Sequence, residues 1–440
     1  MSLRKITFKN LDELKKHIQS HEPTFYFSSQ TSTVIPYDKL EEIYKDQDFF
    51  LGNLSQLPSS MELSDDGILK IEGPVNWQDA KAYLRSKGHN LMTAPTENLA
   101  LISSGAATSA TGERCFHFGT LRSQITEIKY LNHEGVEITL AADQNFGQID
   151  ADYNKEYAKY SEFKNAPFPR FEKATDLLIG TEGQLGVITE LSIKTTKDEP
   201  VQHLFMLLPK WEEDNSAHIE ACNLIQNFRD DVIVCEFIDS NSFSYLPKEE
   251  RPNMEMDALF FEIKMDAFER FYEDYLQKLS FLDEEQVFEL TETKFQNIRA
   301  SIPRAVFEAN SHMGVVKKGT DVQVSIEDFK SLLNIYKEMS SKGIKYNLFG
   351  HFGDAHLHFN FMPTVEQEDL CQKELEFLYK EVIKIGGSPF AEHGIGILKQ
   401  KYITDFWTDS QYKVFKNLKS THDPHNQFFP QGFMNLAGEP

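Results

Sequence analysis

The stretch Gly350-His-Phe-Gly-Asp-Ala-His-Leu-His-Phe-Asn360 carries three histidines, an aspartate and an asparagine. Side chains alternate along a strand, so His356, His358 and Asn360 share one face, and the apolar residues between them face a core. A glycine-containing turn can bring His351 to the same point. Neutral imidazoles with a carboxylate are the usual ligands of a divalent transition metal. The stretch therefore predicts a metal or catalytic site on a paired-strand region at 346–361.

A second cluster, Glu392-His393-Gly-Ile-Gly396, follows Gly386-Gly387 and supplies the missing carboxylate. The alternative is a histidine-rich strand whose imidazoles are only hydrogen-bonded in place. For any one of these histidines taken alone, simple hydrogen bonding is the better explanation. Three histidines with two acidic residues favour a metal or catalytic site.

Upstream of this region, Arg299 and Arg304 lie on an expected helix and precede Lys317 and Lys318. An arginine fork and a lysine point charge are what a carboxylate substrate requires. Basic residues on a helix more often form a solvated face, and that alternative stays open at this point.

The first half of the chain holds two segments rich in small residues. One is Leu101-Ile-Ser-Ser-Gly-Ala-Ala-Thr-Ser-Ala-Thr-Gly112, with almost no helix or strand signal, and the other is Ile179-Gly-Thr-Glu-Gly-Gln-Leu-Gly-Val-Ile188. Such residues allow close backbone approach to a ligand, although a tight surface loop and a glycine-rich strand entry are the plainer explanations. The chain has no G-x-G-x-x-G or Walker motif, so a Rossmann or P-loop site is not supported.

The order of the elements predicts two domains of the α+β class. A strand–helix unit, a hairpin at 125–140 and a Pro- and Tyr-rich loop at 150–171 fill the first half. After Pro200 strands alternate with helices, which is typical of an antiparallel sheet with helices on one face. The tail after about residue 410 is compatible with either domain.

The net charge of −23 argues against nucleic acid and anionic membranes as partners. The four cysteines have neither metal-site nor disulfide-framework spacing, and no apolar run can span a bilayer. No signal-peptide pattern precedes the first helix pattern. A cytoplasmic protein is expected.

Together these segments resemble the FAD-binding flavoproteins of the vanillyl-alcohol oxidase fold, also called the p-cresol methylhydroxylase (PCMH) type. The nearest branch holds the glycolate oxidase D-subunit, D-lactate dehydrogenase and D-2-hydroxyglutarate dehydrogenase. The resemblance covers about residues 10 to 435. It rests on the small-residue segment 103–112, Gly119-Thr-Leu-Arg122, Gly180–Thr189, the Gly350–His358 motif and Glu392-His-Gly-Ile-Gly-Ile-Leu-Lys399.

The resemblance implies a PCMH-type FAD-binding domain at 1–199, a cap or substrate domain at 200–410 and a C-terminal segment at 411–440 that returns toward the FAD domain. FAD is the implied cofactor. The implied cofactor-binding residues are Ser103, Ser104, Thr108, Ser109, Gly112, Gly119, Glu182, Gly186, Val187 and Ile188. A zinc or manganese ion is also implied, with His351, His358 and Glu392 as its ligands.

The implied reaction is oxidation of a small D-2-hydroxy acid of the lactate, glycolate or 2-hydroxyglutarate class. His393 is the implied base, and the substrate contacts are Arg299, Asn360 and Lys317 or Lys318. Electrons would pass to an electron-transfer protein or a quinone, and a homodimer is one oligomeric state to expect. The alternatives are an accessory flavoprotein subunit with a degenerate FAD site, and a metal-free oxidase on the same fold.

The chain departs from the family pattern in places. The loop at 25–33, Phe-Tyr-Phe-Ser-Ser-Gln-Thr-Ser-Thr, has no glycine where the family has a glycine-rich pyrophosphate loop. His356 replaces the usual asparagine, Ala355 replaces a glycine, and Pro303 stands where the 2-hydroxyglutarate branch has a threonine.

Overall fold

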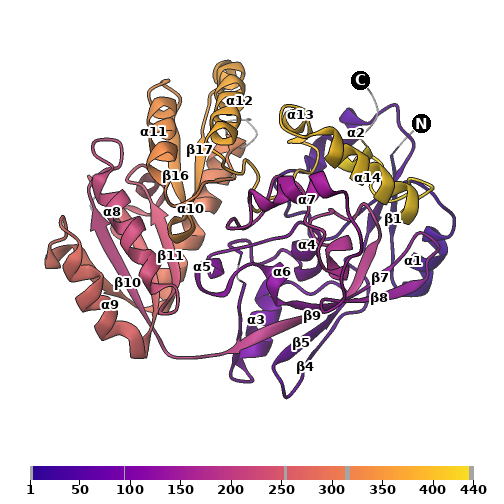
Figure 1. Cartoon of the computed structure of the whole chain (residues 1–440), viewed down its shortest axis with the longest axis horizontal. Coiled ribbons are helices and arrows are strands. Elements are labelled where there is room, and N and C mark those ends of the chain that lie inside the picture. The colour runs from indigo at the N-terminus through magenta and orange to yellow at the C-terminus, as the bar shows by residue number, and fades with distance from the viewer. Residues whose placement is uncertain (1–2, 94, 252–254, 313–317, 436–440) are drawn as a thin grey trace.

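The computed structural model describes residues 3–435 except Ala94, 252–254 and 313–317. Two halves lie side by side, joined where β9 (Val187–Lys197) runs on into β10 (Val201–Leu208). β9 belongs to the sheet of the first half and β10 to that of the second. The second half is drawn on the left of Figure 1, and the earliest and latest segments of the chain lie together on the right.

The first half contains two sheets. A parallel three-stranded sheet has the order β1-β3-β2, and an antiparallel six-stranded sheet has the order β4-β5-β9-β7-β8 with β6 beside β9. The strands are β1 (Arg4–Thr7), β2 (Thr24–Phe27), β3 (Phe50–Asn53), β4 (Ser60–Leu63), β5 (Ile68–Glu72), β6 (His89–Leu91), β7 (Ile125–Leu131) and β8 (Glu137–Ala141). The predicted hairpin at 125–140 is thereby confirmed.

The longer helices of this half begin at side-chain caps that the sequence indicates. Asn10 accepts from the backbone N–H of Glu13 at the start of α1, and Asn76 accepts from that of Asp79 at the start of α3. The helices are α1 (Leu11–Ile18), α2 (Leu40–Ile43), α3 (Trp77–Arg85), α4 (Ile102–Ala107), α5 (Cys115–Phe118), α6 (Leu121–Gln124) and α7 (Ala151–Ala158).

The second half is built on one eight-stranded sheet with the order β13-β10-β12-β11-β16-β17-β14, and β15 also pairs with β17. All of its pairings are antiparallel, which confirms the expected sheet type. The remaining strands are β11 (Val232–Ile238), β12 (Asp257–Lys264), β13 (Val287–Leu290), β14 (Lys318–Gly319), β15 (Val322–Gln323), β16 (Tyr346–His351) and β17 (His356–Phe361).

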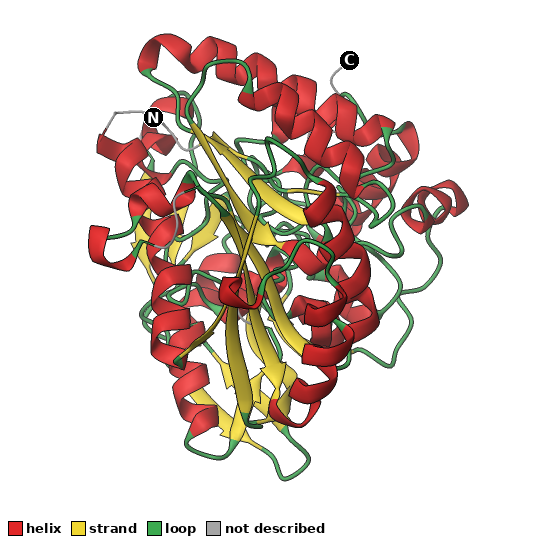
Figure 2. Cartoon of the chain, turned by 90° about the vertical axis from the view of Figure 1, so that its left-hand side faces the viewer, coloured by secondary structure: helices red, strands yellow, loops and turns green. Residues whose placement is uncertain are grey.

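Helices cover both faces of this sheet (Figure 2). α8 (Ser216–Ile225), α9 (Phe268–Asp274) and α11 (Phe329–Ser340) bury their apolar sides on one face, and α12 (Glu368–Lys384) packs beside α11. α10 (Glu292–His312) lies on the opposite face, where Phe295, Ile298 and Ile302 pack on apolar residues of β10 to β12. The structure thus adds a helix on the second face to the expected arrangement.

Two segments differ from the expectation of irregular loops. The stretch 103–112 begins inside α4, whose Ile102 and Ala106 are buried beside Trp77 of α3. The stretch 150–171 begins with α7, where Asp150 accepts from the N–H of Asp152 and Tyr153 is buried. Tertiary packing stabilises both short helices, so their weak helix propensity did not reveal them.

The end of the chain packs on the first half. α14 (Asp409–His422) contacts α7, and a bridge pairs Thr24 of β2 with Phe428. α13 (Gln400–Ile403) precedes it. The glycine-free loop achieves its turn with Gln30, which takes a φ of 57°.

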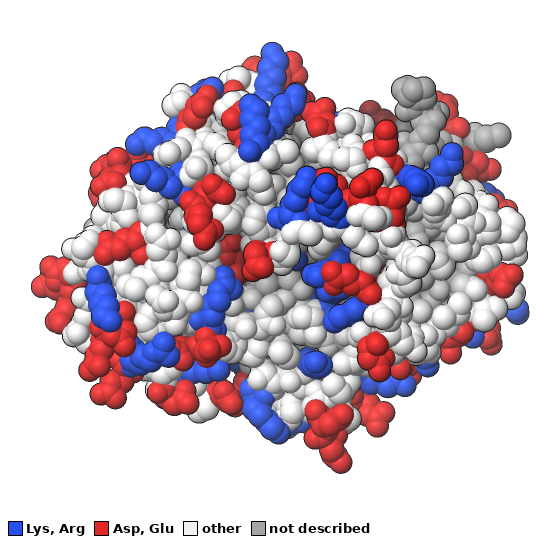
Figure 3. All heavy atoms as spheres, in the orientation of Figure 1, with Lys and Arg blue, Asp and Glu red and all other residues white. Residues whose placement is uncertain are grey.

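Charged side chains of both signs are interspersed over the face drawn in Figure 3, with no single acidic patch. Within the described ranges, none of the helices is both long and apolar enough to cross a membrane.

Candidate active site

A cleft of about 2120 Å³ lies between the two halves and is lined by residues of both. One wall comes from the second sheet, α10 and the Glu392–His393 turn. The other comes from α4, the loop after it, the 25–33 loop and the segment entering β9. Ligand pockets usually measure about 300–1,000 Å³, so this cleft has room for a dinucleotide together with a small acid.

The turn between β16 and β17 forms the histidine wall. Gly350 has a φ of +143°, and a Cβ there would meet the carbonyl oxygen of His356 at 2.8 Å, so this position requires glycine. Ala355 closes the turn in the left-handed region at a φ of 49°, without the glycine of the family pattern. The turn places His351 opposite His356 in the strand register, which brings the imidazoles to one face.

The carboxylate of Glu392 lies between two of these imidazoles. Nε2 of His351 is 3.2 Å from Oε2, and Nε2 of His358 is 3.1 Å from Oε1. Thr111 of the first half also donates its hydroxyl to Oε2. The three predicted metal ligands therefore converge, and the hydrogen bond from Thr111 connects Glu392 to the opposite wall of the cleft.

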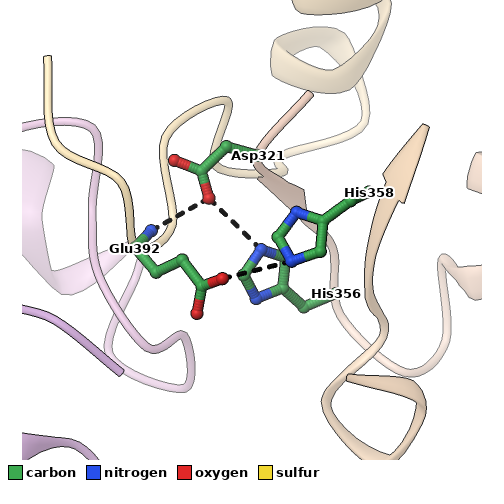
Figure 4. A group of neighbouring side chains, drawn as sticks. All are labelled: Asp321, His356, His358 and Glu392. Atoms are coloured by element: carbon green, nitrogen blue, oxygen red, sulfur yellow. Dashed lines mark hydrogen bonds and ion pairs between the residues drawn. The ribbon is translucent and has the colours of Figure 1, made fainter. Parts of the chain in front are cut away.

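Asp321 anchors the Glu392–His393 turn, and Figure 4 shows the dashed contact from its carboxylate to the backbone of Glu392. Its carboxylate accepts the backbone N–H of Glu392 at 3.0 Å, that of His393 at 2.9 Å and Nζ of Lys399 at 2.8 Å. Its side chain is fully buried, and Lys399 with His393 outweighs the effect of burial and keeps the pKa of Asp321 well below its usual value. Asp321 is thus a fixed anion that positions the turn.

Glu236 of β11 sits on the far side of His351. Nδ1 of His351 donates to Oε1 of Glu236 at 2.7 Å. Burial lowers the pKa of His351, but Glu236 and Glu392 outweigh burial and raise it to about 9. His351 is therefore a cation between two carboxylates here, and its Nε2 proton occupies the place from which this nitrogen would bind a metal.

His393 lines the cleft and is about one-third exposed, in contrast to the buried imidazoles behind it. Its ring stacks on that of His358 with centroids 5.1 Å apart. Nε2 lies 3.4 Å from Oε1 of Glu392. The ring is thus held in place with one edge open to the cleft, as a general base requires.

Arg299 of α10 also lines the cleft, but it is not free of partners. Its guanidinium forms an ion pair with Glu113 of the first half, and its Nη2 lies 3.5 Å from Oε2 of Glu236. All three side chains are buried. The predicted carboxylate-binding residue therefore also joins the two halves.

The other predicted substrate contacts lie elsewhere. Asn360 is fully buried behind the cleft wall, where its amide donates to the carbonyl of His358. Lys317 lies outside the described residues, and of Lys318 only the backbone, in β14, is described. Arg304 lines the cleft and pairs with Glu308.

Most of the predicted cofactor-binding residues line the opposite wall, namely Ser103, Ser104, Thr108, Gly112, Glu182, Gly186, Val187 and Ile188. Ser109 is buried and donates to Asn165, and Gly119 ends α5 with a φ of 74°. Neither of these two residues lines the cleft. The wall is close-packed, since a Cβ on Gly105 would lie 3.0 Å from Trp77.

Glu182 connects this wall to the Glu392–His393 turn. Its carboxylate accepts the backbone N–H of Ile395 at 2.6 Å and that of Gly396 at 2.9 Å. Burial raises the pKa of Glu182 to about 7. The segment that enters β9 therefore fixes the backbone that follows His393, through the carboxylate of Glu182.

Sequence reasoning missed several charged residues of the site. The sequence could have indicated Glu236, because it is the one charged residue in the apolar strand Val232–Ile238, and a buried charge needs a partner. Lys164, which is buried 3.2 Å from Asp354, comes from an irregular loop, and Asp321 lies between two very short strands. Their local sequence has no periodicity to mark them.

Residues 219–431 match the family described as "FAD linked oxidases, C-terminal domain". The chain is 23% identical over 387 residues to the mitochondrial D-lactate dehydrogenase [cytochrome] of Kluyveromyces lactis, covering 83% of this chain and 62% of that protein. It is 25% identical over 335 residues to the mitochondrial D-2-hydroxyglutarate dehydrogenase of Danio rerio, covering 73% and 58%. The chain thus spans about three-fifths of the length of these relatives.

Among solved structures, an alkyldihydroxyacetonephosphate synthase superposes with a TM-score of 0.66 at 14% identity. The superposition covers 96% of this chain and 76% of the other. At that sequence identity the superposition establishes the fold alone. The two halves of this chain are arranged as in the PCMH-type fold.

Proposed function

Because residues 219–431 match the family of FAD-linked oxidases and the relatives are D-2-hydroxy acid dehydrogenases, we propose that this chain is an FAD-dependent dehydrogenase of small D-2-hydroxy acids. The observation that carries the proposal is the convergence of His351, His358, Glu392 and His393 on the wall of the cleft that faces α4 and the β9 entry. Electrons from the reduced FAD would pass to an electron-transfer protein or a quinone.

The cleft fits FAD by its size and by the small residues on the wall that the first half supplies, among them Ser103, Ser104 and Gly112. When bound, FAD supplies the hydride acceptor of the reaction. Ser103, Ser104 and Thr108 offer hydroxyls to its polar groups, and Val187 with Ile188 offers an apolar surface. The loop at 25–33 offers backbone amides and hydroxyls in place of glycine.

His351, His358 and Glu392 fit a divalent metal, because two imidazole nitrogens already lie about 3 Å from one carboxylate. Such an ion would act as a Lewis acid on the substrate hydroxyl. The protein's own contribution is to hold these donors in place, through Glu236 at Nδ1 of His351 and Asp321 at the backbone N–H of Glu392.

His393 is the proposed acceptor of the hydroxyl proton. Its ring is fixed by stacking on His358 and by Glu392, and it is exposed on the cleft side. A fixed imidazole next to a carboxylate is well placed to receive a proton and to stabilise the resulting cation.

Arg299 is the proposed contact of the substrate carboxylate. A guanidinium has five N–H donors, which is more than the two ion pairs with Glu113 and Glu236 require. Donors therefore remain for an anion that enters from the cleft. Holding the carboxylate there orients the substrate relative to His393.

The test is a screen of D-2-hydroxy acids with the purified chain and an artificial electron acceptor. Substrate should bleach the visible flavin absorption and reduce the dye, and the L-enantiomer should not. His393→Gln should lower the turnover at least about a hundredfold while the flavin spectrum is retained. A colourless purified protein, or no response to any D-2-hydroxy acid, would refute the proposal.

The metal is tested separately by elemental analysis. Wild type should hold about one equivalent of zinc or manganese, and His358→Ala should lose it. His218→Ala is the matched control, because His218 is a buried histidine of α8 that pairs with Asp257, away from the cleft. If His358→Ala keeps full activity, the metal role is wrong.

A further inference from the structure

His356 is the histidine of the cluster that the family pattern leaves without a role. It is fully buried, and neither of its ring nitrogens forms a hydrogen bond with any described residue. A buried polar atom without a partner is destabilising, because its hydrogen bonds to water are lost on folding and not replaced. An imidazole with two such nitrogens therefore indicates a ligand that the protein alone does not provide.

The surroundings of His356 indicate what this ligand is. One donor atom each of Asp321, His356, His358 and Glu392 lies within 4.8 Å of all the others. Figure 4 shows both ring nitrogens of His356 turned toward the side of the two carboxylates. Two imidazoles and two carboxylates around one point are the donor set of a divalent cation.

A simple hydrogen bond to Asp321 does not explain the arrangement. Nε2 of His356 is 3.3 Å from Oδ1 of Asp321, but the contact lacks hydrogen-bond geometry. Both oxygens of Asp321 already accept other donors, from the Glu392–His393 backbone and from Lys399. Asp321 is thus an anchor for the cluster, and its contact with His356 leaves both ring nitrogens of His356 without a hydrogen bond from the described residues.

We infer that His356 is a further metal ligand, next to His351, His358 and Glu392. This inference rests on the metal site of the proposed function and adds to it a residue specific to this chain. Ring centroids of His356 lie 4.7 Å from His358 and 5.2 Å from His351, and Nε2 of both His351 and His358 lies within 3.2 Å of Glu392.

The added ligand has a consequence for the choice of metal. Four protein ligands would close a tetrahedral zinc site, whereas a five- or six-coordinate ion keeps a position for a substrate oxygen. A set of three imidazoles and one carboxylate therefore favours manganese, iron or cobalt over tetrahedral zinc in the working enzyme.

The experiment counts imidazole ligands directly. The purified, FAD-containing chain is loaded with one equivalent of Zn²⁺, and X-ray absorption at the zinc edge reports the number of coordinating imidazoles. Wild type should give three and His356→Asn two. Competition with a chelating dye should show that His356→Asn weakens Zn²⁺ binding at least about tenfold, as even residues behind metal ligands do.

His218→Asn is the control, since it removes a buried histidine of the same half outside the cluster. It should leave both the imidazole count and the affinity unchanged. The rise in melting temperature on adding Zn²⁺ is measured for each variant against its own metal-free form, so a destabilised variant still gives an answer.

Two imidazoles in the wild type, or unchanged Zn²⁺ affinity in His356→Asn, would overturn the inference. The wild-type count decides even if the variant fails to fold. These outcomes leave D-2-hydroxy acid oxidation intact, whereas failure of the proposed function appears as absent flavin bleaching by substrate. A wild type that binds no Zn²⁺ overturns the inference as well.

Discussion

Oε1 of Glu236 lies 2.7 Å from Nδ1 of His351, and this contact fixes which nitrogen of His351 faces Glu392. Burial raises the pKa of Glu236, but His351 and Arg299 outweigh it and lower the pKa to about 2. Glu236 is therefore an anion at any working pH. Because its second oxygen lies near Arg299, one carboxylate connects the proposed metal ligand to the proposed substrate contact.

We expect Glu236→Gln to weaken metal binding by roughly 10- to 100-fold, because a neutral amide holds the imidazole less firmly. The measurement is chelator competition with the purified chain. Glu262→Gln is the control, since Glu262 lies on the adjacent strand and pairs with Arg114, not with His351. Equal metal affinity in both variants would mean that Glu236 does not orient His351.

Arg299 should matter for stability as well as for substrate binding. Arg299→Gln leaves Glu113 and Glu236 buried without their cation, which costs about 3–5 kcal/mol for a broken buried pair. The double variant Arg299→Gln, Glu113→Gln should be more stable than Arg299→Gln alone. Thermal unfolding of the wild type, both single variants and the double variant measures this coupling, and strictly additive effects would contradict it.

The histidine wall could be predicted because strand geometry is local. Alternation along β17 places His356 and His358 on one face, and the structure has them there. The pairing of this strand with β16, and the turn between them, also follow from the glycines and the apolar pattern. That part of the fold needs no knowledge of distant residues.

The second layer of the site could not be predicted in this way. Glu236 reaches His351 only because β11 pairs with β16, more than a hundred residues later in the chain. Asp321 and Lys164 come from segments without periodicity. The ion pair of Arg299 with Glu113 depends on how the two halves face each other, which no local pattern encodes.

Asp239, at the end of β11, gives a pH-dependent test of the second sheet. Burial and then the neighbouring Asp257 raise the pKa of Asp239 from its ordinary 3.8 to about 8. Between these values the folded chain keeps a proton that the unfolded chain has lost, so this group lowers the stability as the pH rises through the window. Above about pH 8 its contribution levels off.

Asp239→Asn, which is nearly isosteric, removes this titration. Its melting temperature relative to the wild type should therefore increase from pH 5 to pH 8. Asp266→Asn controls for the loss of one charge, because Asp266 is exposed on the same half. A difference between Asp239→Asn and wild type that does not change with pH would show that Asp239 does not hold the proton.

Gln30 provides the last test, in the glycine-free loop that lines the cleft. Its φ of 57° is in the left-handed region, which costs a residue with a Cβ about 1–2 kcal/mol. Its side chain is exposed, so no packing is lost on truncation. Gln30→Gly should therefore stabilise the chain by up to about 1 kcal/mol, after the larger entropy of glycine in the unfolded state is subtracted.

The matched control is Thr33→Gly in the same loop, since Thr33 is also exposed and has no positive φ. There glycine relieves no strain and only adds freedom to the unfolded chain, so Thr33→Gly should be destabilising. Thermal unfolding of the two variants measures the difference. If Gln30→Gly lowers the melting temperature as Thr33→Gly does, the left-handed conformation of Gln30 does not destabilise the chain, and the prediction is wrong.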